Sequence, residues 1–203
     1  MTRAEFIESL RESLNDAASV FSTDDTDYLR HLDMALRDFS QPNHRPLRKR
    51  GTLTLVADTR DYDAPADFQG MAWCDYGTAS REQYRPWQPQ YMTTQFVLIA
   101  MRGATGWQLR TARDVTSDLI ALHGSACGFF YYATHILSEI ECSVRDNDMP
   151  LLLLRAQAEA MREMSIRNIF KPVQLRTGVA GAPSNGTPGG LYSLLMDYYE
   201  ASF

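Results

Sequence analysis

The sequence predicts an α+β fold: a helical bundle with an inserted small antiparallel β region and an extended C-terminal arm. Three observations predict it. Apolar residues recur every three or four positions near both ends of the chain, and short alternating stretches fill the middle. Residues 178–190 contain seven glycines and prolines among thirteen positions. The chain has 203 residues, 44% of them hydrophobic, which is enough for a compact core.

The first forty residues predict two helices, over 2–16 and 23–40. Thr2 and Glu5 have the spacing of a capping box, and Thr23 can cap the second helix. The apolar stripes comprise Phe6, Leu10 and Leu14 in the first helix and Leu29, Leu32, Leu36 and Phe39 in the second. Because the link between them is short, we expect the two helices to pack antiparallel.

The middle of the chain predicts a β region over residues 51–145. The expected strands are 52–56, 95–101, 107–110 and 127–137, with a hairpin loop at 102–106. Residues 61–68 are expected to form a turn-rich link between strands. Residues 77–90 follow no pattern that indicates a role.

A third helix is expected over 149–169. Pro150 suits its first turn, where a missing backbone N–H costs nothing, and Leu, Ala and Met dominate up to Ile166. This segment has the strongest helical pattern in the chain, so we expect it to be the central core helix. Residues 1–177 would then form a single domain.

Residues 178–203 are expected to form a C-terminal docking arm. The glycine- and proline-rich stretch costs much backbone entropy to fix, so it needs contacts to become ordered. Thr187 and Pro188 begin a last helix whose apolar face must pack on a partner or on its own bundle. The candidate docking residues are Lys171, Arg176, Leu191, Tyr192, Leu195, Tyr198, Tyr199 and Phe203.

Charge is distributed unevenly along a chain whose formal net charge is −5. Residues 1–43 carry nine acids and four bases; these acids either form solvated helix faces or line a channel that repels DNA. Residues 44–50 carry four bases and no acid, and are expected to form a basic loop. It could contact DNA phosphates, an acidic neighbouring subunit or partner protein, or solvent alone. The candidate interface residues are Arg45, Arg48, Lys49 and Arg50.

No residue pattern indicates catalysis. His123, Ser125 and Asp118 are close in sequence, but no G-x-S-x-G elbow surrounds the serine, and His135 suits a hydrogen-bonded position near a sheet. We expect no catalytic residue, metal site or cofactor.

The three cysteines predict neither a disulfide framework nor a zinc site. Cys74, Cys127 and Cys142 are far apart in sequence and show no C-x-x-C spacing. We expect reduced thiols that pack as small hydrophobic groups. The leucine run at 151–154 is far too short to cross a membrane.

Several motifs in this order resemble the head-to-tail adaptors (connector or neck proteins) of tailed bacteriophages. An acidic helix pair and a strand precede the sequence YDAPADF at 62–68, which matches the pattern Tyr-x-x-Pro-x-Asp-Phe typical of that family. FFYYATHILSE at 129–139, LLLLRAQAEAMRE at 151–163 and the ending at 185–200 complete the resemblance.

The resemblance implies a structural virion protein made in the host cytoplasm and located in the neck. It implies a homo-oligomeric ring of twelve copies below the portal protein. The C-terminal segment of each copy would reach the portal. The partners would be the portal, neighbouring copies, the next neck or tail protein, and genomic DNA that passes through the lumen without sequence-specific contact. Two alternatives stay open: a tail-completion or stopper protein, and a non-viral binding module or enzyme.

Overall fold

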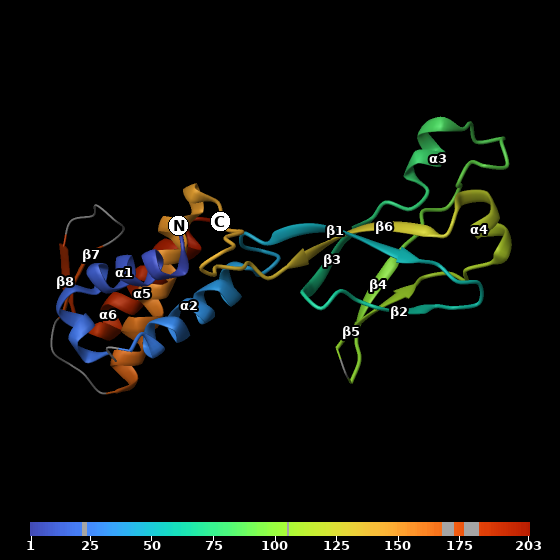
Figure 1. Cartoon of the computed structure of the whole chain (residues 1–203). Helices are drawn as coiled ribbons and strands as arrows, with labels where there is room; N and C mark the ends of the chain where they lie inside the picture. Colours follow the sequence, from blue (N-terminus) through green and yellow to red (C-terminus); the bar gives the residue numbers. More distant parts are fainter. Residues whose placement is uncertain (22–23, 105, 168–172, 177–182) are drawn as a thin grey trace. The chain divides into compact units, whose positions relative to one another are not determined.

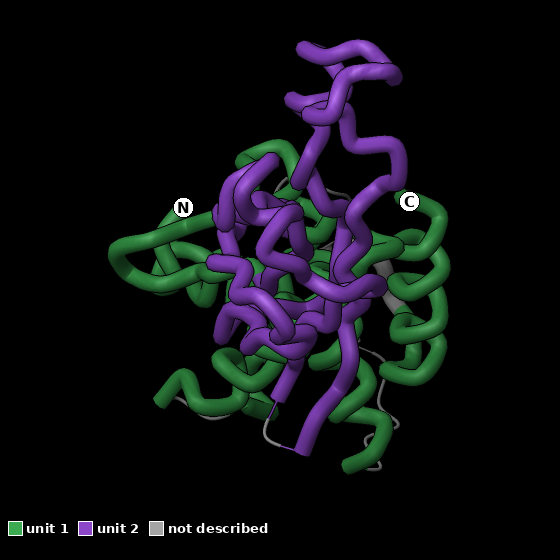
Figure 2. The backbone as a smooth tube through the Cα atoms, turned by 90° about the vertical axis from the view of Figure 1, so that its right-hand side faces the viewer, with its two compact units in different colours: residues 1–46, 135–203 green, residues 47–134 purple. Residues whose placement is uncertain are grey.

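A computed structural model describes residues 1–21, 24–104, 106–167, 173–176 and 183–203. The chain forms two compact units (Figures 1 and 2). Unit 1 combines residues 1–46 with 135–203, and unit 2 is the continuous segment 47–134. The combination of helices with small antiparallel sheets confirms the predicted α+β class.

Unit 1 is a helical bundle built around α5 (Met149–Ile166), which contacts α1, α2 and α6. Its other elements are α1 (Arg3–Leu14), the 3-10 helix η1 (Asn15–Val20), α2 (Thr26–Phe39), the 3-10 helix η2 (Asp146–Asp148), the hairpin strands β7 (Val173–Arg176) and β8 (Pro183–Gly186), and α6 (Pro188–Glu200). The third helix expected from the sequence is therefore present as α5, and it lies at the centre of the unit.

The beginnings of α1 and α2 differ in how well the sequence predicts them. The capping box of α1 is formed: the Glu5 amide donates to Thr2 Oγ1 over 3.2 Å, and the Thr2 amide donates to Glu5 Oε2 over 2.8 Å. α2 begins at Thr26 after Asp25, a left-handed residue with φ of 65°, and not at residue 23 as predicted. The predicted cap, Thr23, is outside the described residues.

The core of unit 1 includes three residues of the predicted docking arm. Leu191, Leu195 and Tyr199 of α6 are buried together with Phe6, Leu10, Phe39, Leu152 and Met161 of the other helices. The expected boundary after residue 177 thus separates α6 from the helix α5 on which it packs. The division into 1–177 and 178–203 stays a prediction about which segment reaches a partner.

Unit 2 contains two three-stranded antiparallel sheets. The first has the order β1–β6–β3, formed by β1 (Leu47–Thr54), β6 (Ala126–Ala133) and β3 (Phe68–Cys74). The second has the order β2–β5–β4, formed by β2 (Asp61–Asp63), β5 (Trp107–Thr111) and β4 (Leu98–Arg102). Two short helices accompany them, α3 (Thr78–Gln83) and α4 (Ser117–His123).

The predicted basic loop was wrong, because Arg48, Lys49 and Arg50 lie within strand β1. Lys49 occupies an inward position of the strand, where its Nζ pairs with Asp67 over 2.7 Å. Gly51 is the next inward residue, since an added Cβ would lie 2.5 Å from the Phe129 ring. A lysine and a glycine at inward positions hid the alternation that marks a strand.

The expected link at 61–68 contains the whole of strand β2 and the first residue of β3, joined by a tight turn. β2 ends at Asp63, and β3 begins at Phe68, which is buried. Asp67 accepts hydrogen bonds from Lys49 Nζ (2.7 Å) and from the Tyr131 hydroxyl (2.9 Å). Burial alone would raise the pKa of Asp67, but these two bonds lower it. The family motif therefore fixes the entry to β3 against its sheet.

Candidate interaction surfaces

Helix α6 presents one face to the core and the other to solvent. Thr187 caps it by accepting from the Gly190 amide over 3.4 Å, and Pro188 occupies its first position as predicted. Tyr198 (52% exposed) and Phe203 (43%) are accessible, and Tyr192 is half-buried. Of the other docking candidates, Lys171 is outside the described residues, and Arg176 is described only as a backbone position in β7 paired with Pro183.

The end of the chain is held by the segment that follows α2. The His44 ring stacks on Phe203 with ring centroids 4.4 Å apart, and it meets Tyr199 edge-on at 5.4 Å. The Arg45 guanidinium lies 5.7 Å from the Phe203 ring and donates to the Ser202 carbonyl over 3.3 Å. Arg45 therefore belongs to unit 1, so the structure does not place it in one loop with the other three predicted bases.

Two groups of charged residues link the helices of unit 1 to one another. Arg155 on α5 donates to Asp38 on α2 over 2.6 Å and lies 2.6 Å from Glu159 Oε1. Arg155 and Glu159 are both buried. The Arg155 guanidinium also lies 5.8 Å from the Tyr199 ring, so the same cation meets α6. This group links three helices.

The second charged group surrounds Glu163 of α5. Arg30 donates to Glu163 Oε2 over 2.6 Å, His31 Nε2 lies 2.7 Å from the same oxygen, and Arg167 pairs with Oε1. Burial alone would raise the pKa of Glu163, but the bonds from Arg30 and His31 lower it. Burial lowers the pKa of His31, and Glu163 opposes this only in part.

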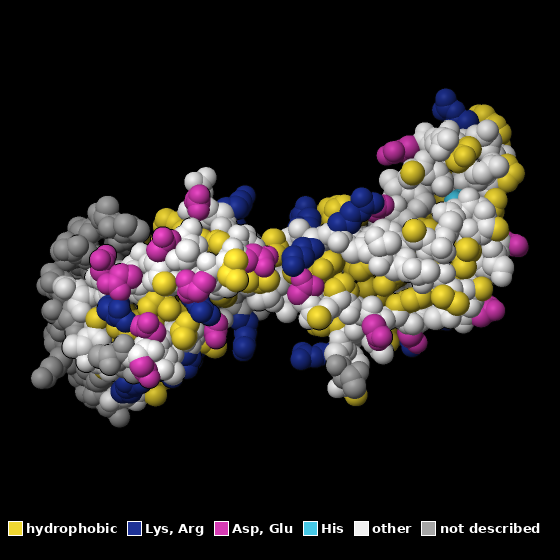
Figure 3. Space-filling model, viewed as in Figure 1, with side chains coloured by type: hydrophobic (Ala, Val, Ile, Leu, Met, Phe, Trp, Pro, Cys, Tyr) yellow, Lys and Arg dark blue, Asp and Glu magenta, His cyan; other side chains and the backbone are white. Residues whose placement is uncertain are grey.

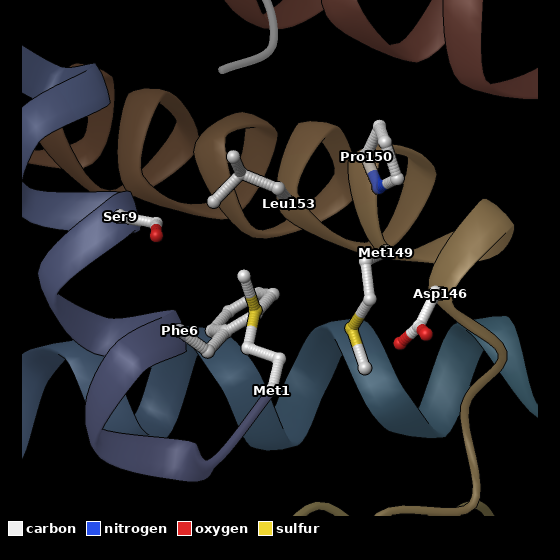
Figure 4. A pocket seen from close by; sticks show the side chains of 7 residues that line it. All are labelled: Met1, Phe6, Ser9, Asp146, Met149, Pro150 and Leu153. Atoms are coloured by element: carbon white, nitrogen blue, oxygen red, sulfur yellow. The ribbon is translucent and has the colours of Figure 1, made fainter.

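A cavity of about 240 Å³ opens between α1 and α5 (Figure 4). Its lining residues are Met1, Phe6, Ser9, Asp146, Met149, Pro150 and Leu153. The Ser9 hydroxyl already donates to the Glu5 carbonyl over 2.9 Å, and Asp146 supplies the one carboxylate of the lining. The lining brings together no nucleophile with a base, so its chemistry suits an apolar side chain more than a reaction.

A second, more open hollow lies beside the chain end. Its volume is about 370 Å³, and its lining includes Arg45, Leu151, Leu154 and Ser202. Leu151 and Leu154 are only partly buried, on the side of α5 away from the fully buried Leu152 and Leu153. The hollow therefore gives the region around Arg45 an apolar floor.

His123, Ser125 and Asp118 form no hydrogen bond with one another among the described contacts. His123 ends α4, and its Nδ1 lies 3.1 Å from Ser80 Oγ. Asp118 is exposed on α4, and no carboxylate completes the pair among the described contacts. Burial and then Arg113 lower the pKa of His123.

His135 is buried and fully engaged in hydrogen bonds. Its Nε2 lies 2.7 Å from the Arg45 carbonyl, which can only accept, so Nε2 carries the proton. Its Nδ1 lies 3.0 Å from Ser143 Oγ, and its amide donates to Ser40 Oγ over 2.9 Å. This histidine joins three segments of unit 1, which is the structural role expected from the sequence.

The described cysteines and acidic or histidine side chains form no further site. Cys74 and Cys127 are buried with their sulfurs 3.7 Å apart, whereas Cys142 is exposed. The hydrogen bond between the two free thiols lowers the pKa of Cys74 and raises the pKa of Cys127. Over the described ranges, no cluster of His, Cys, Asp and Glu has the arrangement of a metal site. No helix in that part of the chain is long and apolar enough to span a bilayer.

The outer face of the β1–β6–β3 sheet carries a group of arginines and aromatic rings that sequence reasoning missed. It consists of Arg48, Arg50, Trp73, Phe130 and Tyr132, and is called here the arginine–aromatic face. Figure 3 shows basic and hydrophobic side chains gathered over β1 and β6. Alternation through RKRGT and GFFYY could have placed these residues on one face.

A comparison with family models matches residues 1–129 to the family described as SU10 adaptor protein. The match, together with the α+β fold, defines the class of protein as a structural adaptor of bacteriophages. The match covers more than half of the 203 residues, and the chain belongs to the SU10 adaptor protein family. None of the curated proteins matches the chain.

Proposed function

We propose that the chain forms a ring in the neck of the phage particle, between the portal above and the tail components below. The observation that carries this proposal is the family match over residues 1–129, which spans α1, α2 and almost all of unit 2. The ring of twelve copies and the passage of DNA through its lumen without sequence-specific contact are what the family resemblance implies.

The C-terminal contact with the portal uses the exposed side of α6. Leu191, Leu195 and Tyr199 hold the helix on α5, which leaves Tyr198 and Phe203 accessible. Partly exposed aromatic residues beside arginine are the composition of interface anchors, and Arg45 lies over Phe203. The hollow next to Arg45 and Ser202 can receive an apolar side chain of the partner.

Binding of the purified chain to its portal protein tests the docking surface. We expect Tyr198→Ser and Phe203→Ser together to weaken binding by roughly tenfold or more, because interface aromatics carry a large share of binding energy. Leu122→Ser on α4, a 48%-exposed apolar residue in unit 2, is the matched control and should bind as the wild type does. Equal binding by all three proteins would move the portal contact elsewhere.

The function itself is tested by removing the gene product from the phage. We expect DNA-filled heads that carry no tail, visible by electron microscopy. Tailed, infectious particles that form without the chain would contradict the proposal. Tailless heads that keep the portal but have lost their DNA would instead favour a tail-completion or stopper role.

A further inference from the structure

We infer that the arginine–aromatic face is a contact between copies, in which Arg48 binds a carboxylate on the helical unit of a second copy. The inference rests on the proposed function, since a ring is where copies meet. It adds the surface, the anchor residue and the chemistry of its occupant.

Arg48 is held in place by two rings. Its guanidinium carbon lies 5.0 Å from the centre of the Trp73 ring and 6.0 Å from that of Tyr132, its cross-strand partner. A guanidinium fixed in this way has already lost much of its side-chain freedom, so it binds an acid at a smaller entropic cost.

The charge of Arg48 is not matched within the part of the chain that the structure describes. Lys49 pairs with Asp67 over 2.7 Å, and Arg50 pairs with Asp75 over 3.1 Å, but no ion pair of Arg48 occurs among the described contacts. Arg48 is exposed, and its fork of N–H donors suits a carboxylate or a phosphate.

The rings of this face are less suited to stacking on nucleic-acid bases. Trp73 stacks on Phe130 with centroids 4.3 Å apart, and the Arg48 guanidinium lies over the same indole. Phe130 in turn has Arg50 at 5.8 Å. Since arginines and neighbouring rings already pack on these rings, the face offers N–H donors and ring edges, which fit a protein carboxylate.

Charge complementarity identifies the occupant. Unit 1 holds 17 acids and 11 bases, whereas unit 2 holds 8 acids and 9 bases. Glu12 of α1 and Asp33 of α2 are exposed, and neither forms an ion pair among the described contacts. Figure 3 shows acidic side chains gathered over α1 and α2. A contact between unlike surfaces of identical copies is the heterologous type that closes rings.

The test measures association between copies by sedimentation velocity, for the full chain alone and mixed with portal. We expect Arg48→Glu to weaken association by about tenfold or more. Arg102→Glu is the matched control: Arg102 is also an exposed arginine of unit 2, with its guanidinium 5.8 Å from the Trp107 ring. It should associate as the wild type does, and raising the salt should weaken only proteins that retain Arg48 and its acids.

A charge exchange separates contact between copies from contact within one chain. Glu12→Arg with Asp33→Arg should weaken association as Arg48→Glu does, and an equal mixture of the two variant proteins should restore it to within about threefold. Pairing within a single chain could not be restored by mixing.

Each result decides the inference. Equal association by Arg48→Glu and Arg102→Glu, no recovery in the mixture, or a wild-type chain that stays monomeric even with portal would overturn it. Portal binding by the Arg48→Glu monomer is measured alongside. If that binding persists while Arg48→Glu associates as the wild type does, the proposed function stands and only this inference falls.

Discussion

Unit 1 buries charged side chains inside a helical core, whereas the described charged side chains of unit 2, such as Lys49 and Asp67, are exposed or only partly buried. Arg155, Glu159 and His31 are at most 7% exposed in unit 1, and the described part of unit 2 buries no charged residue to that degree. The core of unit 2 is instead rich in aromatic rings, such as Phe68, Phe96 and Phe129. Buried ion pairs add little net stability but allow few alternative packings. The buried charged groups of unit 1 therefore fix the positions of its helices.

The units also differ in how the chain builds them. Unit 2 is one continuous segment, while unit 1 needs both ends of the chain to complete its core. The family match ends at residue 129, within β6, so α5 and α6 lie beyond it. The matched part of the chain therefore contributes α1 and α2 to a core that unmatched residues complete.

Deleting residues 187–203 should have the largest effect on stability, and that effect should fall on unit 1 and not on unit 2. The deletion removes Leu191, Leu195 and Tyr199 from the core of unit 1 and exposes the side of α5 that they cover. Each large apolar side chain lost contributes about 2–5 kcal/mol. We expect unit 1 to lose cooperative unfolding.

The unfolding of unit 2 can be followed separately by tryptophan signal, because the three tryptophans, Trp73, Trp87 and Trp107, all lie in unit 2. Helical circular dichroism should lose its sharp transition, while the tryptophan transition persists. Leu194→Ala, which alters a 36%-exposed residue of the same helix, should change little. An unchanged helical transition after the deletion would show that α6 is not part of the core of unit 1.

Arg155→Met should destabilise unit 1 by about 3–5 kcal/mol, because it leaves the buried Glu159 without its main partner. Arg162→Met removes the other, more exposed partner of Glu159, 3.2 Å away, and should cost less than about 1 kcal/mol. Urea unfolding followed by circular dichroism gives both values. Similar losses for the two variants would mean that burial does not decide the strength of this group.

Gly51→Ala should destabilise unit 2 by about 1–3 kcal/mol through overpacking, since the new Cβ would lie 2.5 Å from the Phe129 ring. The loss should appear in the tryptophan transition and leave the helical transition in place. Thr52→Ala, on the exposed side of the same strand, is the control and should stay within about 0.5 kcal/mol. A larger shift in the helical transition would show that Gly51 supports the other unit.

The same contrast explains what the sequence could predict. Helical periodicity located α1, α2 and α5 to within a few residues, because one buried stripe per helix is a local signal. Strands were harder. Lys49 and Gly51 interrupt the alternation of β1, and β3 changes register between Phe68 and Gly70 and again between Met71 and Trp73. An irregular strand has no simple period.

The candidate surfaces were only partly predictable. The sequence shows that α6 has an apolar face, but whether α5 or a partner covers that face depends on distant residues. Arg48 was singled out for its charge, yet its position beside Trp73 results from a pairing across β6 that joins residues far apart in sequence. Tertiary contacts, and not local pattern, separate Arg48 from Lys49 and Arg50.

The smallest expected effect concerns pH and compares one histidine from each unit. Burial lowers the pKa of His31 in unit 1 and of His123 in unit 2 below the ordinary value of about 6.5. In each case the unfolded chain takes up a proton that the folded chain resists, so stability falls as pH decreases below about 6.5. The slope cannot exceed about 1.4 kcal/mol per pH unit for one proton. Glu163, whose pKa is lowered, adds its own loss of stability only at more acidic pH, below the ordinary glutamate value of about 4.3.

Between pH values of about 4.3 and 6.5, His31→Gln should flatten the pH dependence of the helical transition and leave the tryptophan transition unchanged. His123→Gln should do the reverse with a smaller change, because His123 is only partly buried. If His31→Gln keeps the full slope of the helical transition, the acid sensitivity of unit 1 comes from its carboxylates and not from the histidine beside Glu163.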